Sequence, residues 1–230
     1  MAEGAAHPSW RSALLALLVI APLPSIGVYC ALYASPGVLG SSLWIAAKLG
    51  FVLGPALWWR CVQRQPWQWP RWPAAGIGVG TLLGVAMLAT IVAAFALFGR
   101  GTDFTTMREL VTTAGLSSPT RYLLLAAYWT LINSLIEEYA FRWFLFRQAS
   151  YLGGATFGVV LSAVLFTVHH SLALAAYVPW HLNLLASLGV MAGGLLWSLC
   201  YYRYQSLWPG YIAHVGADIA VFAIGYHLLF

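Results

Sequence analysis

The sequence contains very little charge. Only 7% of its 230 residues are Asp, Glu, Lys or Arg, whereas 61% are hydrophobic. Soluble globular domains carry about 25% charged residues, so this composition excludes a soluble fold. Acidic residues are the scarcest, six against eleven Lys and Arg, and most basic residues lie in or beside short gaps between apolar runs. This pattern is typical of an integral membrane protein close to anionic lipid, and it predicts no nucleic-acid partner.

Cysteine is scarce as well. The three cysteines, Cys30, Cys61 and Cys200, are scattered and form no CxxC pair. We therefore expect free thiols and no structural metal site of the cysteine type.

Long apolar runs, in contrast, fill most of the chain. Runs of about 20 residues are long enough to span a bilayer, and we place them at 12–33, 40–59, 74–98, 120–148, 154–170, 182–202 and 208–229. The sequence therefore predicts an all-α, polytopic membrane bundle of about seven transmembrane helices, within a range of six to eight, with its active site inside the bundle. Tryptophans mark the predicted edges, as expected for the headgroup layer: Trp67, Trp69, Trp72, Trp180 and Trp208.

The first apolar run is interpreted as a retained anchor. It is longer than the apolar core of a signal peptide, although "ALYAS" at 31–35 resembles a cleavage site. The gap at 99–119 is the only loop of any size, and it predicts a short interfacial helix capped by Asp103 or Thr105. We expect one integral membrane domain in two parts. Residues 1–119 hold helices 1–3 and the connecting loop, without motifs, and residues 120–230 hold helices 4–7.

The basic residues predict the orientation. An odd number of spans puts the two termini on opposite sides, and the positive-inside rule favours a cytoplasmic N-terminus. Six arginines then lie at the cytoplasmic face and three outside: Arg11, Arg60, Arg64, Arg71, Arg147 and Arg203 against Arg100, Arg108 and Arg121. The small size and the abundance of Ala, Leu, Gly and Trp favour a multi-pass protein of a bacterial cytoplasmic (inner) membrane.

A few ionisable residues lie inside the predicted spans. A charge at membrane depth costs at least ~2.5–3.5 kcal/mol, so such residues are candidates for function. They are Lys48, Glu137, Glu138, Arg142, His169, His170, His214 and Asp218.

The segment "SLIEEYAFRW" at 134–143 carries two adjacent glutamates. On a helix Glu138 and Arg142 share a face and can form an ion pair, which leaves Glu137 without a partner. A buried carboxylate of this kind suits a general base or acid near neutral pH. A purely structural interpretation, a salt-bridge clasp within the bundle, is equally compatible with these residues.

Two further pairs lie on later spans. In "LFTVHHSL" at 165–172, Phe166 can stack on the imidazole of His170, one turn away, and we expect His169 to point elsewhere. In "AHVGADIA" at 213–220, His214 and Asp218 are also one turn apart. Their spacing suits a metal-binding pair, an oriented histidine or two hydrogen-bond donors aimed at one point. At 1.5 Å per residue, the three segments reach roughly the same central layer of the membrane.

These segments together resemble a known family. "EEYAFR" fits EExxxR, "FTVHH" fits FxxxH, and "HVGAD" fits HxxxN in all but its last residue. In order and membrane setting they are similar to the CPBP family, which includes the CAAX prenyl endopeptidases and the bacterial Abi proteins. The resemblance covers roughly residues 120–225. It implies a glutamate-dependent intramembrane endopeptidase in which residues 120–230 form a CPBP-like catalytic core.

The resemblance also implies roles for the residues. Glu137 is the general base and activates water together with His170, while Glu138 and Arg142 support the site. His214 and the residue at 218 form an oxyanion site. The sequence departs from the family at Asp218, where Asn is usual. An ionised carboxylate would repel an oxyanion, so Asp218 must be protonated or act only by orienting His214.

Alternatives to this hypothesis remain within the same set of residues. The sequence lacks HExxH, GxSxG and a pair of intramembrane aspartates, which speaks against other intramembrane proteases. A zinc-dependent hydrolase is an alternative, because the candidate site contains enough ligands, but we favour an enzyme without a cofactor because Arg142 disfavours a nearby dication. A non-enzymatic immunity or transport protein could use the same buried groups. The expected partners are the lipid bilayer and a membrane-anchored or hydrophobic peptide or protein, cleaved near its C-terminal end.

Overall fold

The structure of the protein is a computed structural model that describes residues 8–67 and 72–230. Two predicted interface residues, Trp69 and Arg71, lie outside this part of the chain. The described residues form helices joined by short turns, with no strand among them. The first half contains α1 (Trp10–Ile20), α2 (Leu23–Tyr29), α3 (Val38–Leu57), α4 (Ala74–Phe98) and α5 (Thr105–Thr113). The second contains α6 (Pro119–Ala127), α7 (Ser134–Glu137), α8 (Phe146–Tyr177), α9 (Trp180–Tyr204) and α10 (Trp208–Leu229).

Short π-helical segments join several of these helices. They are η1 (Cys30–Ala34), η2 (Trp58–Val62), η3 (Tyr128–Asn133) and η4 (Glu138–Leu145). Segments η3 and η4 lie in the helix that carries the two glutamates. A π-helix has more residues per turn than an α-helix, so neighbouring side chains diverge by less than ~100°. Glu137 and Glu138 themselves keep α-helical backbone angles, with φ/ψ of −69°/−43° and −61°/−42°.

Six continuous helical stretches are long and apolar enough to cross a membrane within the described chain. The fourth, Pro119–Tyr177, contains 59 residues and bends at Gly153 and Gly154. Gly154 has a φ of +79°, which other residues rarely adopt, and the bend divides the stretch into two spans. The protein is therefore a polytopic helical membrane bundle with seven crossings, as the apolar runs predicted.

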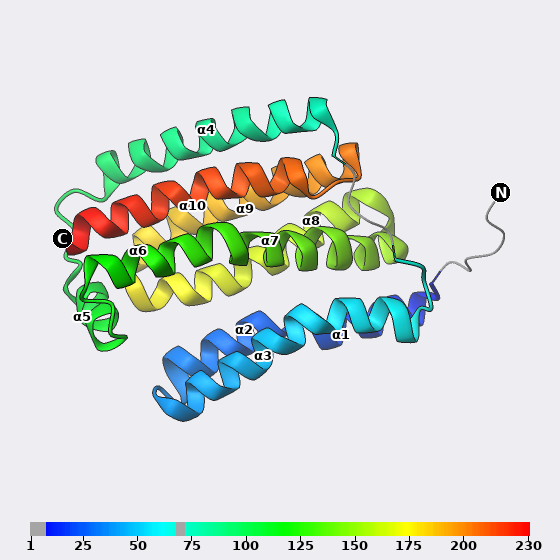
Figure 1. Cartoon of the computed structure of the whole chain (residues 1–230), viewed down its shortest axis with the longest axis horizontal. Helices are drawn as coiled ribbons and strands as arrows, with labels where there is room; N and C mark the ends of the chain where they lie inside the picture. The colour runs from blue at the N-terminus through cyan, green and yellow to red at the C-terminus, as the bar shows by residue number, and fades with distance from the viewer. Residues whose placement is uncertain (1–7, 68–71) are drawn as a thin grey trace.

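The helices lie side by side with a common long direction (Figure 1). Helix α4 packs along α10, α8 packs along α9, and α1–α3 form a group that contacts α8 and η4. The Trp10 end of α1 and the C-terminal end of α10 lie at opposite ends of the bundle (Figure 1), as expected for an odd number of crossings.

Glycine allows a close contact of α4 with α10. A Cβ atom added to Gly216 would lie 2.6 Å from the Cα atom of Gly84, so α10 needs the small residue at this position. The outer faces remain apolar; Leu82 and Leu97 of α4, for example, are more than two-thirds exposed in the isolated chain. Such faces are suited to lipid contact.

The remaining expectations concern loops and thiols. The predicted short helix in the 99–119 gap is α5, and Asp103 accepts hydrogen bonds from the backbone N–H and hydroxyl of Thr105. These bonds hold the pKa of the Asp103 carboxyl below its usual value. Cys30, Cys61 and Cys200 carry free thiols. The division into residues 1–119 and 120–230 stays a prediction.

Candidate active site

The predicted site residues come together between three helical segments. Glu137 ends α7 and Glu138 begins η4, the two histidines His169 and His170 lie on α8, and His214 lies on α10. The His214 Nε2 atom is 3.7 Å from Glu137 Oε2 and 3.8 Å from Asp218 Oδ1. The three segments, which were predicted to reach the same depth, therefore contact one another in the folded chain.

Glu138 and Arg142 form the predicted ion pair. Arg142 Nη1 lies 3.3 Å from Glu138 Oε1, and neither side chain has more than 1% of its surface exposed. Glu138 Oε1 also lies 3.1 Å from His214 Nδ1, within hydrogen-bonding distance. Glu138 thus joins the arginine on its own helix to the histidine on α10, and it is less available than Glu137 for contact with a substrate.

Aromatic rings surround the guanidinium of Arg142. Its Cζ atom lies 4.4 Å from the ring centroid of Phe166 and 5.1 Å from that of Trp197. Such cation–π contacts compensate a buried guanidinium for part of its lost hydration. Trp197 also stacks on His214, with ring centroids 4.2 Å apart and planes at 17°. Phe166 and Trp197 therefore form an apolar wall against the guanidinium of Arg142 and the imidazole of His214.

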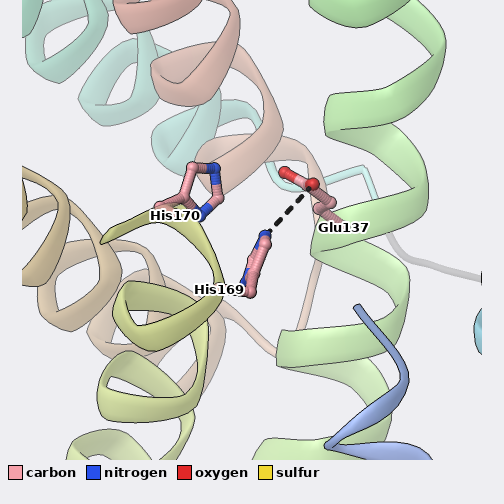
Figure 2. Close-up of side chains that lie close together, drawn as sticks. All are labelled: Glu137, His169 and His170. Atoms are coloured by element: carbon pink, nitrogen blue, oxygen red, sulfur yellow. Dashed lines mark ion pairs between the residues drawn. The ribbon is translucent and has the colours of Figure 1, made fainter. Parts of the chain in front are cut away.

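His169 corrects one sequence-based expectation. It was expected to point away from the site, but its Nε2 atom lies 3.7 Å from Glu137 Oε1, as the dashed line in Figure 2 shows. Its ring stacks on Phe141, with centroids 5.3 Å apart and planes at 7°. Because Phe141 lies on the glutamate helix, one turn after Glu137, this stacking turns His169 towards Glu137 and away from lipid.

His170 reaches the same place with a different orientation. Its Nδ1 atom lies 2.8 Å from the Phe166 carbonyl oxygen, a bond that places the proton on Nδ1 and leaves Nε2 as an acceptor. The Phe166 ring contacts it as predicted, at 4.2 Å between centroids, but at a tilt of 40°. Figure 2 shows both histidines on adjacent positions of α8, facing Glu137.

These three residues have the arrangement of a metal ligand set. One oxygen of Glu137 and one ring nitrogen each of His169 and His170 lie within 4.8 Å of one another. Imidazole and carboxylate ligands in this number suit zinc. The set differs from the one considered from the sequence, since His169 joins it, whereas Glu138 is occupied by Arg142 and His214.

Asp218 has a close partner that sequence reasoning missed. Its Oδ2 atom lies 2.5 Å from the hydroxyl oxygen of Ser134, which is fully buried. The same hydroxyl lies 3.0 Å from the backbone carbonyl of Trp129. Ser134 and Trp197 were missed because they carry no charge and belong to no spacing motif, so only their position beside charged groups in the fold distinguishes them.

Comparison with known proteins agrees with the geometry. No curated protein and no solved structure gives a significant match to the chain. A family model described as type II CAAX prenyl endopeptidase Rce1-like matches residues 119–220. This segment begins with α6, ends within α10 and contains every charged and histidine residue of the site. The match implies an intramembrane CAAX-type protease activity. The resemblance predicted from the three motifs is thus confirmed, and residues 119–220 carry the Rce1-like type II CAAX prenyl endopeptidase family pattern.

Proposed function

We propose that the protein is a glutamate-dependent intramembrane endopeptidase that cleaves a membrane-associated peptide or protein near its C-terminal end. The observation that carries this proposal is Glu137, a buried carboxylate within 4 Å of His169 and His214. Glu138 is neutralised by Arg142, so Glu137 is the carboxylate available for proton transfer. The family match supports the same type of reaction.

In this proposal Glu137 and His170 activate water. Their closest ligand atoms are at most 4.8 Å apart, and a single water forming two bonds of about 2.8 Å can bridge that separation. Glu137 accepts a proton from the water while the water oxygen bonds to the peptide carbonyl carbon. The C–N bond then breaks, and Glu137 returns the proton to the leaving amine.

His214 and Asp218 form the proposed oxyanion site. The bond from His214 Nδ1 to Glu138 fixes the ring, so that Nε2 faces both Glu137 and Asp218. A protonated imidazole in this position donates to a developing oxyanion.

Asp218 fits this site as a neutral acid. The Ser134 hydroxyl has one proton but lies within hydrogen-bonding distance of two acceptors, the Trp129 carbonyl and Asp218. Both contacts are satisfied if Ser134 donates to the carbonyl and Asp218 donates to Ser134. Asp218 in place of the usual Asn would then avoid repelling the oxyanion. We expect Asp218→Asn to retain cleavage within about tenfold, and a complete loss would contradict this assignment.

The reaction as proposed uses no cofactor. The positive charge of Arg142 next to Glu138 makes this pocket less favourable for a second cation. A zinc ion held by Glu137, His169 and His170 is the metal-dependent alternative, and the 4.8 Å grouping is the observation in its favour. In that case zinc would supply Lewis-acid chemistry, and the same residues would serve as ligands.

The decisive experiment removes the charge of Glu137. We expect Glu137→Gln to abolish cleavage at normal expression, because the amide cannot accept the proton. The measurement compares C-terminal and N-terminal profiles of membrane peptides between cells with the wild type and with the variant. Glu109→Gln is the matched control, since Glu109 is an exposed glutamate on α5. Unchanged profiles, with a binding or transport phenotype partly intact, would favour the immunity or transport alternative.

We further propose that the N-terminus lies in the cytoplasm of a bacterial cell, in the inner membrane. The excess of arginines on that side supports this orientation. A reporter enzyme that is active only outside the cytoplasm should then be active when it is fused after Phe230. Activity of a reporter that works only in the cytoplasm would show that the orientation is the opposite one.

A further inference from the structure

The single lysine of the sequence lies in the middle of a span that carries no motif. Lys48 follows the start of α3 at Val38 by ten residues, which is about 15 Å at 1.5 Å per residue. The hydrocarbon core is about 30 Å thick, so Lys48 lies near its centre. Its side chain is half-buried. A lysine at this depth is costly unless a partner or a ligand compensates its charge.

The contacts of Lys48 within the chain compensate it only in part. Its ammonium donates a hydrogen bond to the Asn133 Oδ1 atom and lies 5.5 Å from the ring centroid of Trp129. Among the described residues, which include every acidic residue except Glu3, no carboxylate lies within 4.0 Å of Nζ. An ammonium has three N–H donors, so two remain for another acceptor. Lys48 thus forms no direct ion pair among the described residues, and Glu137 is the acidic residue whose charge acts on it.

Asn133 connects this cation to the proposed active site. It is 4% exposed and accepts the lysine bond through its oxygen, which leaves its amide nitrogen as a further donor. Asn133 precedes Glu137 by four residues on the same continuous helix, a distance of about 6 Å along the axis. Free donors of Lys48 and Asn133 therefore lie about one helical turn from Glu137.

We propose that Lys48 and Asn133 bind the free C-terminal carboxylate of the peptide that the enzyme cleaves. This inference rests on the proposed function. An extended peptide covers about 3.3–3.6 Å per residue, so the axial offset of about 6 Å between Asn133 and Glu137 corresponds to about two residues between the cleaved bond and the chain end. The depth of Lys48 favours a peptide carboxylate over a lipid phosphate, which lies in the headgroup layer. Helix α3, which carries no sequence motif, would thereby select substrates that have a free C-terminal carboxylate.

The test measures binding separately from cleavage. The probes are N-palmitoyl-pentaleucine as the free acid and as the C-terminal amide, which differ only in the anion. Binding is measured to detergent-purified Glu137→Gln protein, which leaves the probes intact. We expect the acid to bind roughly 10- to 100-fold more tightly than the amide, as is typical of a charge-assisted hydrogen bond. In the Glu137→Gln/Lys48→Met protein this ratio should fall to about one.

Controls separate recognition from a general effect on folding. Lys48→Arg should keep most of the acid preference, and so should Arg121→Met, which removes an exposed cation at the start of the same helix as Asn133. A structural defect would weaken the binding of the acid and of the amide equally, and the ratio of their affinities would stay the same. An unchanged ratio in the Lys48→Met variant would therefore overturn the proposal. Phosphatidylglycerol that displaces the acid probe through Lys48 would also overturn it, in favour of a lipid ligand. If wild-type and Glu137→Gln proteins both fail to cleave but the acid preference persists, the proposed protease function fails while the anion site stands.

Discussion

The contact between Gly210 and Glu138 gives a sharp test of the site. Gly210 lies in the first turn of α10, and a Cβ atom added there would lie 2.5 Å from Glu138 Oε2 and 3.5 Å from Trp197 Cβ. Ordinary contacts begin at 3.4 Å, so Gly210→Ala requires the carboxylate or the helix to move by about 0.9 Å. Glu138 is fully buried and its Oε1 atom contacts Arg142 and His214, so a displacement of the carboxylate disturbs both partners.

The size of the effect follows from what Glu138 holds in place. A shift of about 0.9 Å would disturb its 3.1 Å contact with His214, and a misplacement of about 1 Å can lower the rate of an enzyme by about 100-fold. Overpacking of this kind also costs about 1–3 kcal/mol in stability. For a chain of 150–250 residues this corresponds to a fall in Tm of roughly 2–12 °C.

The assay compares Gly210→Ala with a glycine variant that has room. Gly189 of α9 has no atom within 4 Å of an added Cβ, so Gly189→Ala should keep wild-type cleavage and gain slightly in stability from helix propensity. Cleavage of the palmitoylated peptide acid and thermal unfolding in detergent are measured for both variants. Wild-type activity and Tm in Gly210→Ala would refute the conclusion that Glu138 is held rigidly against α10.

Three further predictions concern neighbouring groups. Arg142→Met should destabilise the protein by about 3–5 kcal/mol, because it leaves Glu138 buried without its partner. The double variant Arg142→Met/Glu138→Gln should recover much of the lost Tm, and an equal fall in Tm in the single and the double variant would show that the ion pair is unimportant. His169→Gln should lower kcat at least tenfold, as His170→Gln should, because both side chains face Glu137; full activity of the His169 variant would limit that contact to a structural role. Cleavage should survive exhaustive chelation, whereas a loss that zinc restores would assign the mechanism to the metal-dependent alternative.

Much of the fold could be predicted from local sequence. An apolar run must be a helix in a bilayer, because every backbone polar group needs a partner within its own segment. Because of this requirement, the seven spans could be predicted from hydropathy. Helix geometry likewise made the Glu138–Arg142 ion pair predictable, since residues four apart share a face whatever the surrounding fold.

Contacts between helices could not be predicted in the same way. His169 was assigned away from the site because neighbouring residues on one helix diverge by ~100°, but the rotation of α8 decides what each of them faces. That rotation depends on the bend at Gly154 and on the stacking of His169 against Phe141. Sequence spacing contains neither quantity.

The sequence by itself determined the membrane class, the number of crossings and the residues that carry the chemistry, because hydrophobic length and helical spacing are local properties. The tertiary structure decided how those residues are paired. It placed His169 against Glu137, Ser134 against Asp218, and Lys48 beside Asn133. Each of these contacts joins segments more than 30 residues apart. Their geometry depends on how helices pack and turn against one another, and a span's own sequence does not fix that.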